Sequence, residues 1–265
     1  MFGAYRSQFQ RSQLTAQIDS APPQASTITR QFSYTDWRVV VKAGVSTELG
    51  RWALGATVTT PGLHVLGSGS AFLTEVATPA GARFAWRAQE GIPVSFKSPW
   101  AIAAGAARPF GATTLYVMAE WFAPVARYTL LDADSVVPTD GRPAFDDDVT
   151  LEQQAVLDWG IGFEHHLRAT RSIYAHFKVD RAARPRNSTV NGTYDRWGTY
   201  HVGGGYAFRL GSWDLVVGLT YSWGRDRFVS GETAQPPGGV TIPAGTSATV
   251  TDRRLRFLLG FNVRF

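Results

Sequence analysis

The chain has 265 residues, of which 44% are hydrophobic and 13% are aromatic, and it contains no cysteine. This composition excludes disulfides and cysteine-metal chemistry. The longest apolar run, Trp100–Ala107, is far shorter than the roughly 18 residues that a membrane-spanning helix needs. The net charge is +5, but lysine and arginine form neither a basic helix nor a run of like charge, so we expect no nucleic-acid partner.

Segments of alternating apolar and polar residues recur along the whole chain, and helical periodicity is almost absent. We predict strands at about 2–17, 27–46, 51–60, 68–78, 82–95, 98–108, 112–131, 150–168, 171–182, 193–210, 213–229 and 247–265. Short connections are expected at 47–50, 109–112, 168–171 and 211–212, and long ones near 18–26, 132–149, 183–192 and 230–246. The pattern predicts an all-β fold: an antiparallel transmembrane β-barrel of about 12 strands (range about 10–14) with short periplasmic turns and long extracellular loops. We expect residues 1–265 to form a single domain.

The first hairpin whose register can be predicted has its turn at Pro109–Ala112. A turn of this length would place Ala106 opposite Leu115 and Trp100 opposite Trp121, so that a ladder of small apolar residues ends in a pair of tryptophans.

A second hairpin follows from Gly211-Ser212 as a two-residue turn. This turn places Leu210 opposite Trp213 and Tyr200 opposite Trp223 on an apolar face, with polar residues and glycine on the other face. A slip of one residue would mix the two faces, so the alternation predicts one register.

The last strand ends at the C-terminus with a strict alternation. One face carries leucine, phenylalanine and valine and ends at Phe265, whereas the other carries Arg254, Arg256 and Arg264. An uninterrupted apolar face opposite an arginine-rich face is expected where lipid lies outside a barrel and water lies inside. The terminal aromatic residue resembles the assembly signal of Gram-negative outer-membrane barrels, which implies that Phe265 is read by the barrel assembly machinery.

Three segments carry a resemblance to a known family: Val39–Gly69, Ser98–Thr129 and Tyr200–Trp223. With the terminal phenylalanine, they resemble FadL-like outer-membrane transport proteins for fatty acids and other hydrophobic compounds. That family has a longer barrel with an N-terminal plug that carries an Asn-Pro-Ala motif, and neither the motif nor a segment before the first strand occurs here. The resemblance implies uptake of hydrophobic compounds, with release into the membrane, and no ligand-binding residue carries over.

The inward face of the predicted barrel is where the charged side chains gather. We expect the lumen to be lined by Arg38, Lys42, Glu120, Asp158, Glu164, His176, Lys178, His201, Arg209, Asp214, Arg254, Arg256 and Arg264. They form either a network of ion pairs that fills a narrow barrel or rings of charge that select a permeant. The partners proposed for the C-terminal arginines are carboxylates such as Glu120, Asp158 and Asp214. The aromatic residues expected at the membrane interfaces are Trp100, Trp121, Tyr200, Trp213 and Trp223.

Three residues of the predicted lumen are of types that bind metal ions. If Glu164 lies opposite His176, then His201 on the next strand would complete a set of two histidines and a carboxylate. The simpler interpretation is that these are ordinary polar lumen residues, and we expect no metal and no cofactor.

Two of the long loops are strongly charged. The segment 132–148 holds six aspartates, which favour a solvated loop, or alternatively Ca²⁺ bound between the protein and lipopolysaccharide phosphates. Arg181, Arg184 and Arg186 are either surface charges or contacts to lipid A phosphates.

No catalytic motif of a serine hydrolase, zinc protease or nucleoside triphosphatase occurs, so we do not expect an enzyme. We expect a protein of the Gram-negative outer membrane that allows passive passage of small hydrophobic compounds, with outer-membrane lipid and lipopolysaccharide as partners. The alternatives are a filled barrel that serves as a structural or anchoring subunit with envelope protein partners, and a soluble lipocalin-like binder. Met1–Arg6 shows no signal peptide, so an exported protein would be mature or shortened at its N-terminus.

Overall fold

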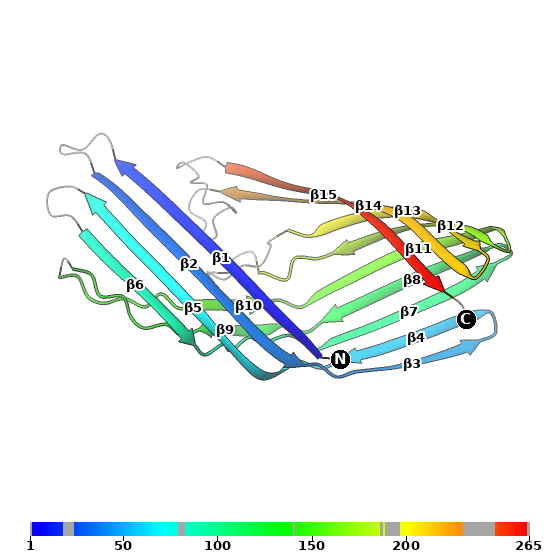
Figure 1. The fold of residues 1–265 in the computed structure, drawn as a ribbon, viewed down its shortest axis with the longest axis horizontal. Helices are drawn as coiled ribbons and strands as arrows, with labels where there is room; N and C mark the ends of the chain where they lie inside the picture. The colour runs from blue at the N-terminus through cyan, green and yellow to red at the C-terminus, as the bar shows by residue number, and fades with distance from the viewer. Residues whose placement is uncertain are drawn as a thin grey trace.

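The computed structural model describes residues 2–17, 24–78, 83–139, 141–185, 188, 197–229 and 247–263. These residues form fifteen strands that pair antiparallel, and they contain no helix (Figure 1). The predicted all-β antiparallel fold class is therefore confirmed. Within the described part of the chain, no helix is long and apolar enough to cross a membrane.

The largest sheet has nine strands, which occupy the right-hand part of Figure 1. They are β3 (Lys42–Leu49), β4 (Trp52–Thr59), β7 (Ala101–Phe110), β8 (Thr113–Phe122), β11 (Val156–Arg168), β12 (Arg171–Asp180), β13 (Thr199–Leu210), β14 (Trp213–Val229) and β15 (Ser247–Val263). Their spatial order is β15-β14-β13-β12-β11-β8-β7-β4-β3. Among the described residues, β15 and β3 are the edges of this sheet.

Two smaller sheets lie toward the other end of the structure. One consists of β1 (Phe2–Gln17), β2 (Gln24–Val39), β5 (Leu63–Thr78) and β6 (Arg83–Ile92), in the order β1-β2-β5-β6. The other pairs β9 (Val125–Leu131) with β10 (Val149–Gln153). Each continues a strand of the large sheet, because the chain passes from β2 to β3, from β8 to β9 and from β10 to β11 through two-residue breaks.

The breaks explain why fifteen strands are found instead of about twelve. Three predicted segments, 27–46, 112–131 and 150–168, are each divided in two, while the other nine correspond to single strands. One break contains Pro124, which has no backbone N–H to continue the hydrogen-bond ladder.

Several breaks lie side by side and form a belt across neighbouring strands. The backbone N–H of Thr60 donates to Val41 O at 2.9 Å, and that of Ala123 donates to Trp100 O at 2.9 Å. The N–H of Gly62 donates to Ser98 Oγ at 2.7 Å. The belt separates the nine-stranded sheet from the smaller sheets.

The predicted register of the β13–β14 hairpin is confirmed. Leu210 pairs with Trp213, Arg209 with Asp214, and Tyr200 with Trp223. Gly211 has a φ of 60°, a conformation that glycine adopts without strain, so the two-residue turn closes the ladder directly.

The predicted register of the β7–β8 hairpin is wrong by two residues. Ala106 pairs with Val117, and Trp121 pairs with Ile102 in place of Trp100. Gly111, with a φ of 62°, allows a two-residue turn at Gly111-Ala112, so Pro109 and Phe110 extend the strand. A shift of two residues keeps every side chain on its predicted face.

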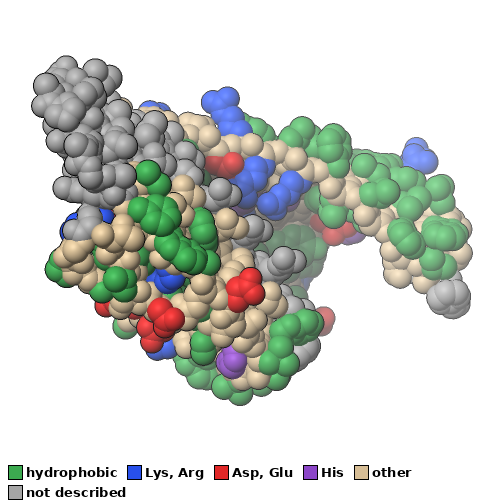
Figure 2. Space-filling model, turned by 60° about the vertical axis from the view of Figure 1, so that its left-hand side comes forward, with side chains coloured by type: hydrophobic (Ala, Val, Ile, Leu, Met, Phe, Trp, Pro, Cys, Tyr) green, Lys and Arg blue, Asp and Glu red, His purple; other side chains and the backbone are tan. Residues whose placement is uncertain are grey.

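The two faces of the nine-stranded sheet differ sharply. One face, called the outward face below, exposes large apolar side chains: Val45, Leu49, Val58, Ile102, Val117, Trp121, Leu157, Ile161, Phe163, Val202, Val217, Leu219, Leu255, Phe257, Leu259 and Phe261. Phe257 is 82% exposed and Leu259 75%. Figure 2 shows hydrophobic side chains over much of the surface. The opposite face is called the inward face.

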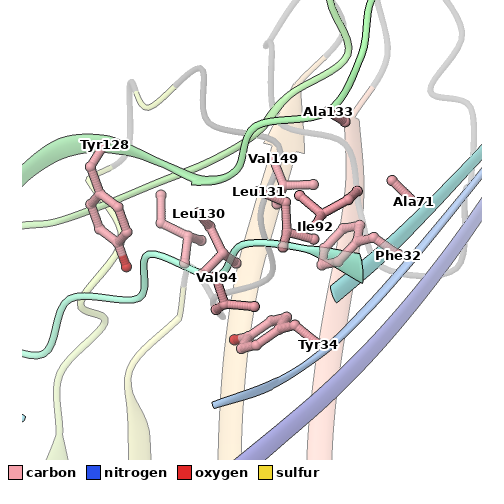
Figure 3. Packing of buried hydrophobic residues seen from close by; sticks show 11 residues of the cluster. Phe32, Tyr34, Ala71, Ile92, Val94, Tyr128, Leu130, Leu131, Ala133 and Val149 are labelled. Carbon is pink, nitrogen blue, oxygen red and sulfur yellow. The ribbon is translucent and has the colours of Figure 1, made fainter. Parts of the chain in front are cut away.

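The main hydrophobic core lies in the smaller sheets. Phe32, Tyr34 and Ala71 of the four-stranded sheet pack with Leu130, Leu131 and Val149 of the β9–β10 region (Figure 3). A second cluster joins Leu73 and Ala85 to Val136, with Phe145 packed against it. The segment 132–148, apart from residue 140, therefore lies over the inner side of β5 and β6.

The acidic segment 132–148 is not only a solvated loop. Asp147 is 9% exposed and its Oδ1 lies 2.8 Å from Arg30 Nε, while Arg87 is 7% exposed and donates to Asp134 O at 2.7 Å. Arg142 contacts Glu75 of β5 at 3.3 Å. Ion pairs to the smaller sheets thus hold the segment down, because two half-buried or buried arginines lie within reach of its carboxylates.

Candidate functional site: the inward face of the nine-stranded sheet

The strand registers place eleven predicted site residues on the inward face of the nine-stranded sheet. These are Lys42, Glu120, Asp158, Glu164, His176, Lys178, His201, Arg209, Asp214, Arg254 and Arg256. Arg38 belongs to β2 instead, and Arg264 lies outside the described residues. Period-two alternation is enough to place them on one face, since each strand turns successive side chains to opposite sides.

Carboxylates form one row across the inward face. Glu120 of β8 pairs with Asp158 of β11. In the same row, Asp180 of β12 pairs with Thr199 of β13, Thr199 pairs with Gly224 of β14, and Gly224 pairs with Asp252 of β15. The N–H of Arg181 donates to Asp158 Oδ1 at 2.7 Å, which places Asp158 beside the end of β12. Asp180 and Asp252 were not among the predicted lumen residues, although they share parity with Lys178 and Arg254 on their strands.

The next row toward the short turns is basic. Lys178 pairs with His201, His201 with Ser222, and Ser222 with Arg254. Lys178 Nζ lies 2.7 Å from Asp180 Oδ1, and Arg254 Nη2 lies 2.6 Å from Asp252 Oδ2. The two rows therefore form a charge-segregated band, in which each cation meets a carboxylate of the neighbouring row.

These pairs correct the predicted partners of the C-terminal arginines. Arg254 pairs with Asp252 on its own strand, and Asp214 pairs with Arg209 at 2.8 Å. Neither Glu120 nor Asp158 forms an ion pair with Arg254 or Arg256 among the described residues. The reason is geometric: the closest inward carboxylate is two residues along β15 and not several strands away.

Ser222, His201 and Asp180 form a hydrogen-bonded chain across three strands. Ser222 Oγ lies 2.7 Å from His201 Nδ1, and His201 Nε2 lies 2.9 Å from Asp180 Oδ2. A serine, a histidine and an aspartate in this order also occur in hydrolases. Here Ser222 is only 1% exposed, so the chain ties β12, β13 and β14 together and does not present a nucleophile.

Glycines on the inward face make room for two larger side chains. A Cβ atom on Gly205 or Gly218 would overlap the Tyr174 side chain, and one on Gly203 would meet His176 Cε1 at 2.5 Å. Tyr174 and His176 therefore lean across β13 and fill space that any larger residue would close.

On the short-turn side of the charged band, the inward face contains a cavity. This cavity of about 1140 Å³ is lined chiefly by small residues of β3, β4, β7, β11 and β12, including Gly44, Gly55, Ala103, Gly105 and Gly162. Tyr116, Met118, Glu164, Tyr174, His176 and Lys178 are the larger inward-facing side chains among its lining residues. The cavity thus combines a mainly apolar wall with a few polar groups at its edge.

Arg38 lies in the belt of strand breaks, apart from the charged band. It pairs with the fully buried Asp36, which also lies 2.6 Å from His64 Nδ1, and its guanidinium is 3.8 Å from the centre of the Phe96 ring. Phe96, Gly62, Trp100 and neighbouring residues line a second cavity of about 360 Å³ beside these breaks.

The residues weighed as a metal site are not brought together as predicted. Glu164 pairs with Tyr174, and His176 pairs with Gly162 and Gly203. Glu164 Oε1 accepts from Ser172 Oγ at 2.7 Å, whereas His201 bonds Ser222 and Asp180. No group of three or more metal-ligating side chains is found in the described part of the chain.

Four of the predicted interface aromatics share the outward face. Tyr200 stacks on Trp223 with ring centres 5.6 Å apart, Trp213 lies 6.0 Å from Phe261, and Trp121 is exposed. Trp100 precedes β7 and lies at the belt. Phe265 and Arg186 lie outside the described residues, so the assembly-signal prediction for Phe265 remains a prediction.

No family model and no curated protein matches the chain. Among solved structures, the chain is similar to a Pseudomonas aeruginosa FadL homologue, with a TM-score of 0.40 and 10% identity over 90% of this chain and 74% of that chain. It is also similar to the FrpB iron transporter from Neisseria meningitidis, with a TM-score of 0.32 and 10% identity over 100% of this chain and 48% of that chain. A third similar structure is the Serratia marcescens hemophore receptor HasR in complex with HasA and heme, with a TM-score of 0.33 and 11% identity over 99% of this chain and 50% of that chain.

Proposed function

We propose that this chain forms a β-barrel of the Gram-negative outer membrane that lets small hydrophobic compounds pass across that membrane without energy input. The observation that carries the proposal is the contrast between the two faces of the nine-stranded sheet. A continuous surface of exposed Leu, Val, Ile and Phe needs an apolar surrounding, while the opposite face holds the charged band.

The cavity supports a permeant of apolar character. Glycine and alanine are the most frequent residues in its wall, which leaves room for a compound beside Tyr116 and Met118. A mainly apolar pocket with few polar groups favours hydrophobic ligands, since polar ligands would lose hydrogen bonds to water there. The second cavity, at the belt of strand breaks, supports a route that leaves the barrel through its wall.

A non-conducting structural or anchoring barrel is the second candidate function. The core between the four-stranded sheet and the β9–β10 region favours it, because Phe32, Tyr34, Leu130 and Leu131 fill the interior at that end. The ion pairs of the segment 132–148 reinforce this filling.

Reconstitution into liposomes tests the two candidates against each other. Uptake of a hydrophobic fluorescent dye above that of protein-free liposomes, together with measurable conductance, supports passage. A protein that inserts fully, as shown by flotation with the vesicles, but takes up no dye contradicts passage. In that case, a partner that co-purifies at fixed stoichiometry in mild detergent would support the anchoring function.

A further inference from the structure

The charged side chains on the outward face of the nine-stranded sheet are all arginines. The strand registers place every described aspartate and glutamate of this sheet on the inward face. Arg108, Arg168 and Arg171 lie at the short-turn end of the outward face, and Arg225, Arg227 and Arg253 lie at the other end. The exposed apolar surface lies between the two arginine groups.

Arg108 has the most specific setting of this group. Its guanidinium lies 5.0 Å from the Trp52 ring centre and 4.8 Å from that of Phe110. Trp52 and Phe110 are both exposed on the outward face, and Arg51 is in the adjoining β3–β4 turn. The buried Nε atom of Arg108 has no hydrogen-bond partner among the described residues.

Arg168 and Arg171 lie directly opposite each other across the β11–β12 turn. Like charges in this position destabilise a hairpin unless an anion lies between them. Neither has an ion-pair partner in the described part of the chain. By contrast, Arg209 at the next turn faces inward and pairs with Asp214 at 2.8 Å.

We propose that the short-turn end of the outward face binds the phosphate groups of anionic glycerophospholipids. Arg108, held between Trp52 and Phe110, would bind one phosphate, and Arg168 with Arg171 would bind a second. The inference rests on the proposed membrane insertion and adds a specific lipid class to it.

The chemistry of the site fits a phospholipid headgroup. A guanidinium donates two parallel hydrogen bonds to a phosphate, and its weak hydration lets it lie on aromatic rings at the edge of an apolar surface. Tryptophan and arginine at this depth meet the headgroup region while the neighbouring Leu49 and Leu115 meet acyl chains. The absence of outward carboxylates on the described strands removes competition for the arginines.

Native mass spectrometry of the detergent-purified protein tests the site. The probes are phosphatidylglycerol, phosphatidylcholine and lipid A, each titrated separately. We expect tighter binding of phosphatidylglycerol than of phosphatidylcholine, and a loss of about fivefold in its affinity for each of Arg108→Gln and Arg171→Gln, since one arginine near a membrane surface contributes about that factor. Arg253→Gln, at the other end of the outward face, should leave phosphatidylglycerol binding unchanged.

Three outcomes would overturn the proposal: equal affinity for phosphatidylglycerol and phosphatidylcholine, unchanged affinity in Arg108→Gln and Arg171→Gln, or an equal loss in Arg253→Gln. Preferential binding of lipid A at these arginines would also reject it. Arg108→Lys keeps the charge but removes the planar guanidinium. An intermediate loss of phosphatidylglycerol affinity in this variant would show that the loss in Arg108→Gln does not come from misfolding. Failure of dye uptake with intact phosphatidylglycerol binding would reject passage alone.

Discussion

Asp147 Oδ1 lies 2.8 Å from Arg30 Nε, so a residue of the segment between β9 and β10 is paired with the second strand of the chain. Arg87 of β6 reaches the same carboxylate at 3.6 Å. Two arginines and one aspartate thus hold the segment 132–148 against the four-stranded sheet. These ion pairs join the connection between β9 and β10 to both β2 and β6.

The first prediction concerns the titration of Asp147, which lies outside the nine-stranded sheet. Burial raises its pKa above the ordinary value of 3.8, and the attraction of Arg30 and Arg87 lowers it by less. The folded protein therefore binds this proton more tightly than the unfolded chain. The resulting stabilisation is complete below about pH 3.8 and is lost as the pH rises through the folded pKa.

Asp147→Asn should remove this pH dependence, because the amide does not titrate. Thermal unfolding midpoints measured from about pH 3 to about pH 8 would check it. Asp146→Asn is the control, since exposed Asp146 bonds Ser135 Oγ and should leave the slope in place. The account fails if Asp147→Asn shows the same slope as the parent protein.

The second prediction concerns the glycines under Tyr174. Gly218→Ala should destabilise the protein by about 1–3 kcal/mol, because the new methyl group overlaps the Tyr174 hydroxyl while its nearest backbone atom, Gly204 O, is 3.3 Å away. Gly260→Ala is the matched control on the same face, since its Cβ would lie 3.8 Å from Val216. Denaturant unfolding should show that Tyr174→Ala restores most of the loss in the double variant, and additive effects would contradict the contact.

The third prediction concerns the chain of Ser222, His201 and Asp180. Ser222→Ala leaves Nδ1 of the half-buried His201 without its partner, which should lower the free energy of unfolding by about 1–3 kcal/mol. Ser212→Ala in the exposed turn should have little effect. Because Ser222 is 1% exposed, a fluorophosphonate probe should not label it; covalent labelling at Ser222 would show that the chain is catalytic.

The fourth prediction concerns the cavity and uses two neighbouring alanines of β7. Both residues border the cavity, but the strand register turns the Ala103 side chain inward, toward the cavity, and the Ala104 side chain outward, where it is exposed. Ala103→Trp should therefore reduce dye uptake by liposomes at least about tenfold if the indole fills the path. Ala104→Trp should insert equally well and keep its uptake. Equal uptake in both variants would show that the cavity is not part of the permeation path.

Several features of this protein followed from local sequence. The alternation of apolar and polar residues assigned the faces correctly even in β7–β8, where the register was wrong, because a shift of two residues leaves parity unchanged. The β13–β14 register was predictable because Gly211-Ser212 allows only a tight turn and both faces match in one alignment. The same alternation places Asp180 and Asp252 on the inward face, so both could have been predicted as lumen residues.

The sequence by itself determined the all-β class, the two faces of each strand and the side on which the charges gather, because these depend on a period of two along one strand. Only the tertiary structure decided where the strands break, which carboxylate meets Arg254, and that Asp147 is buried between Arg30 and Arg87. Those features depend on contacts between strands far apart in the chain, whose relative register no local pattern specifies.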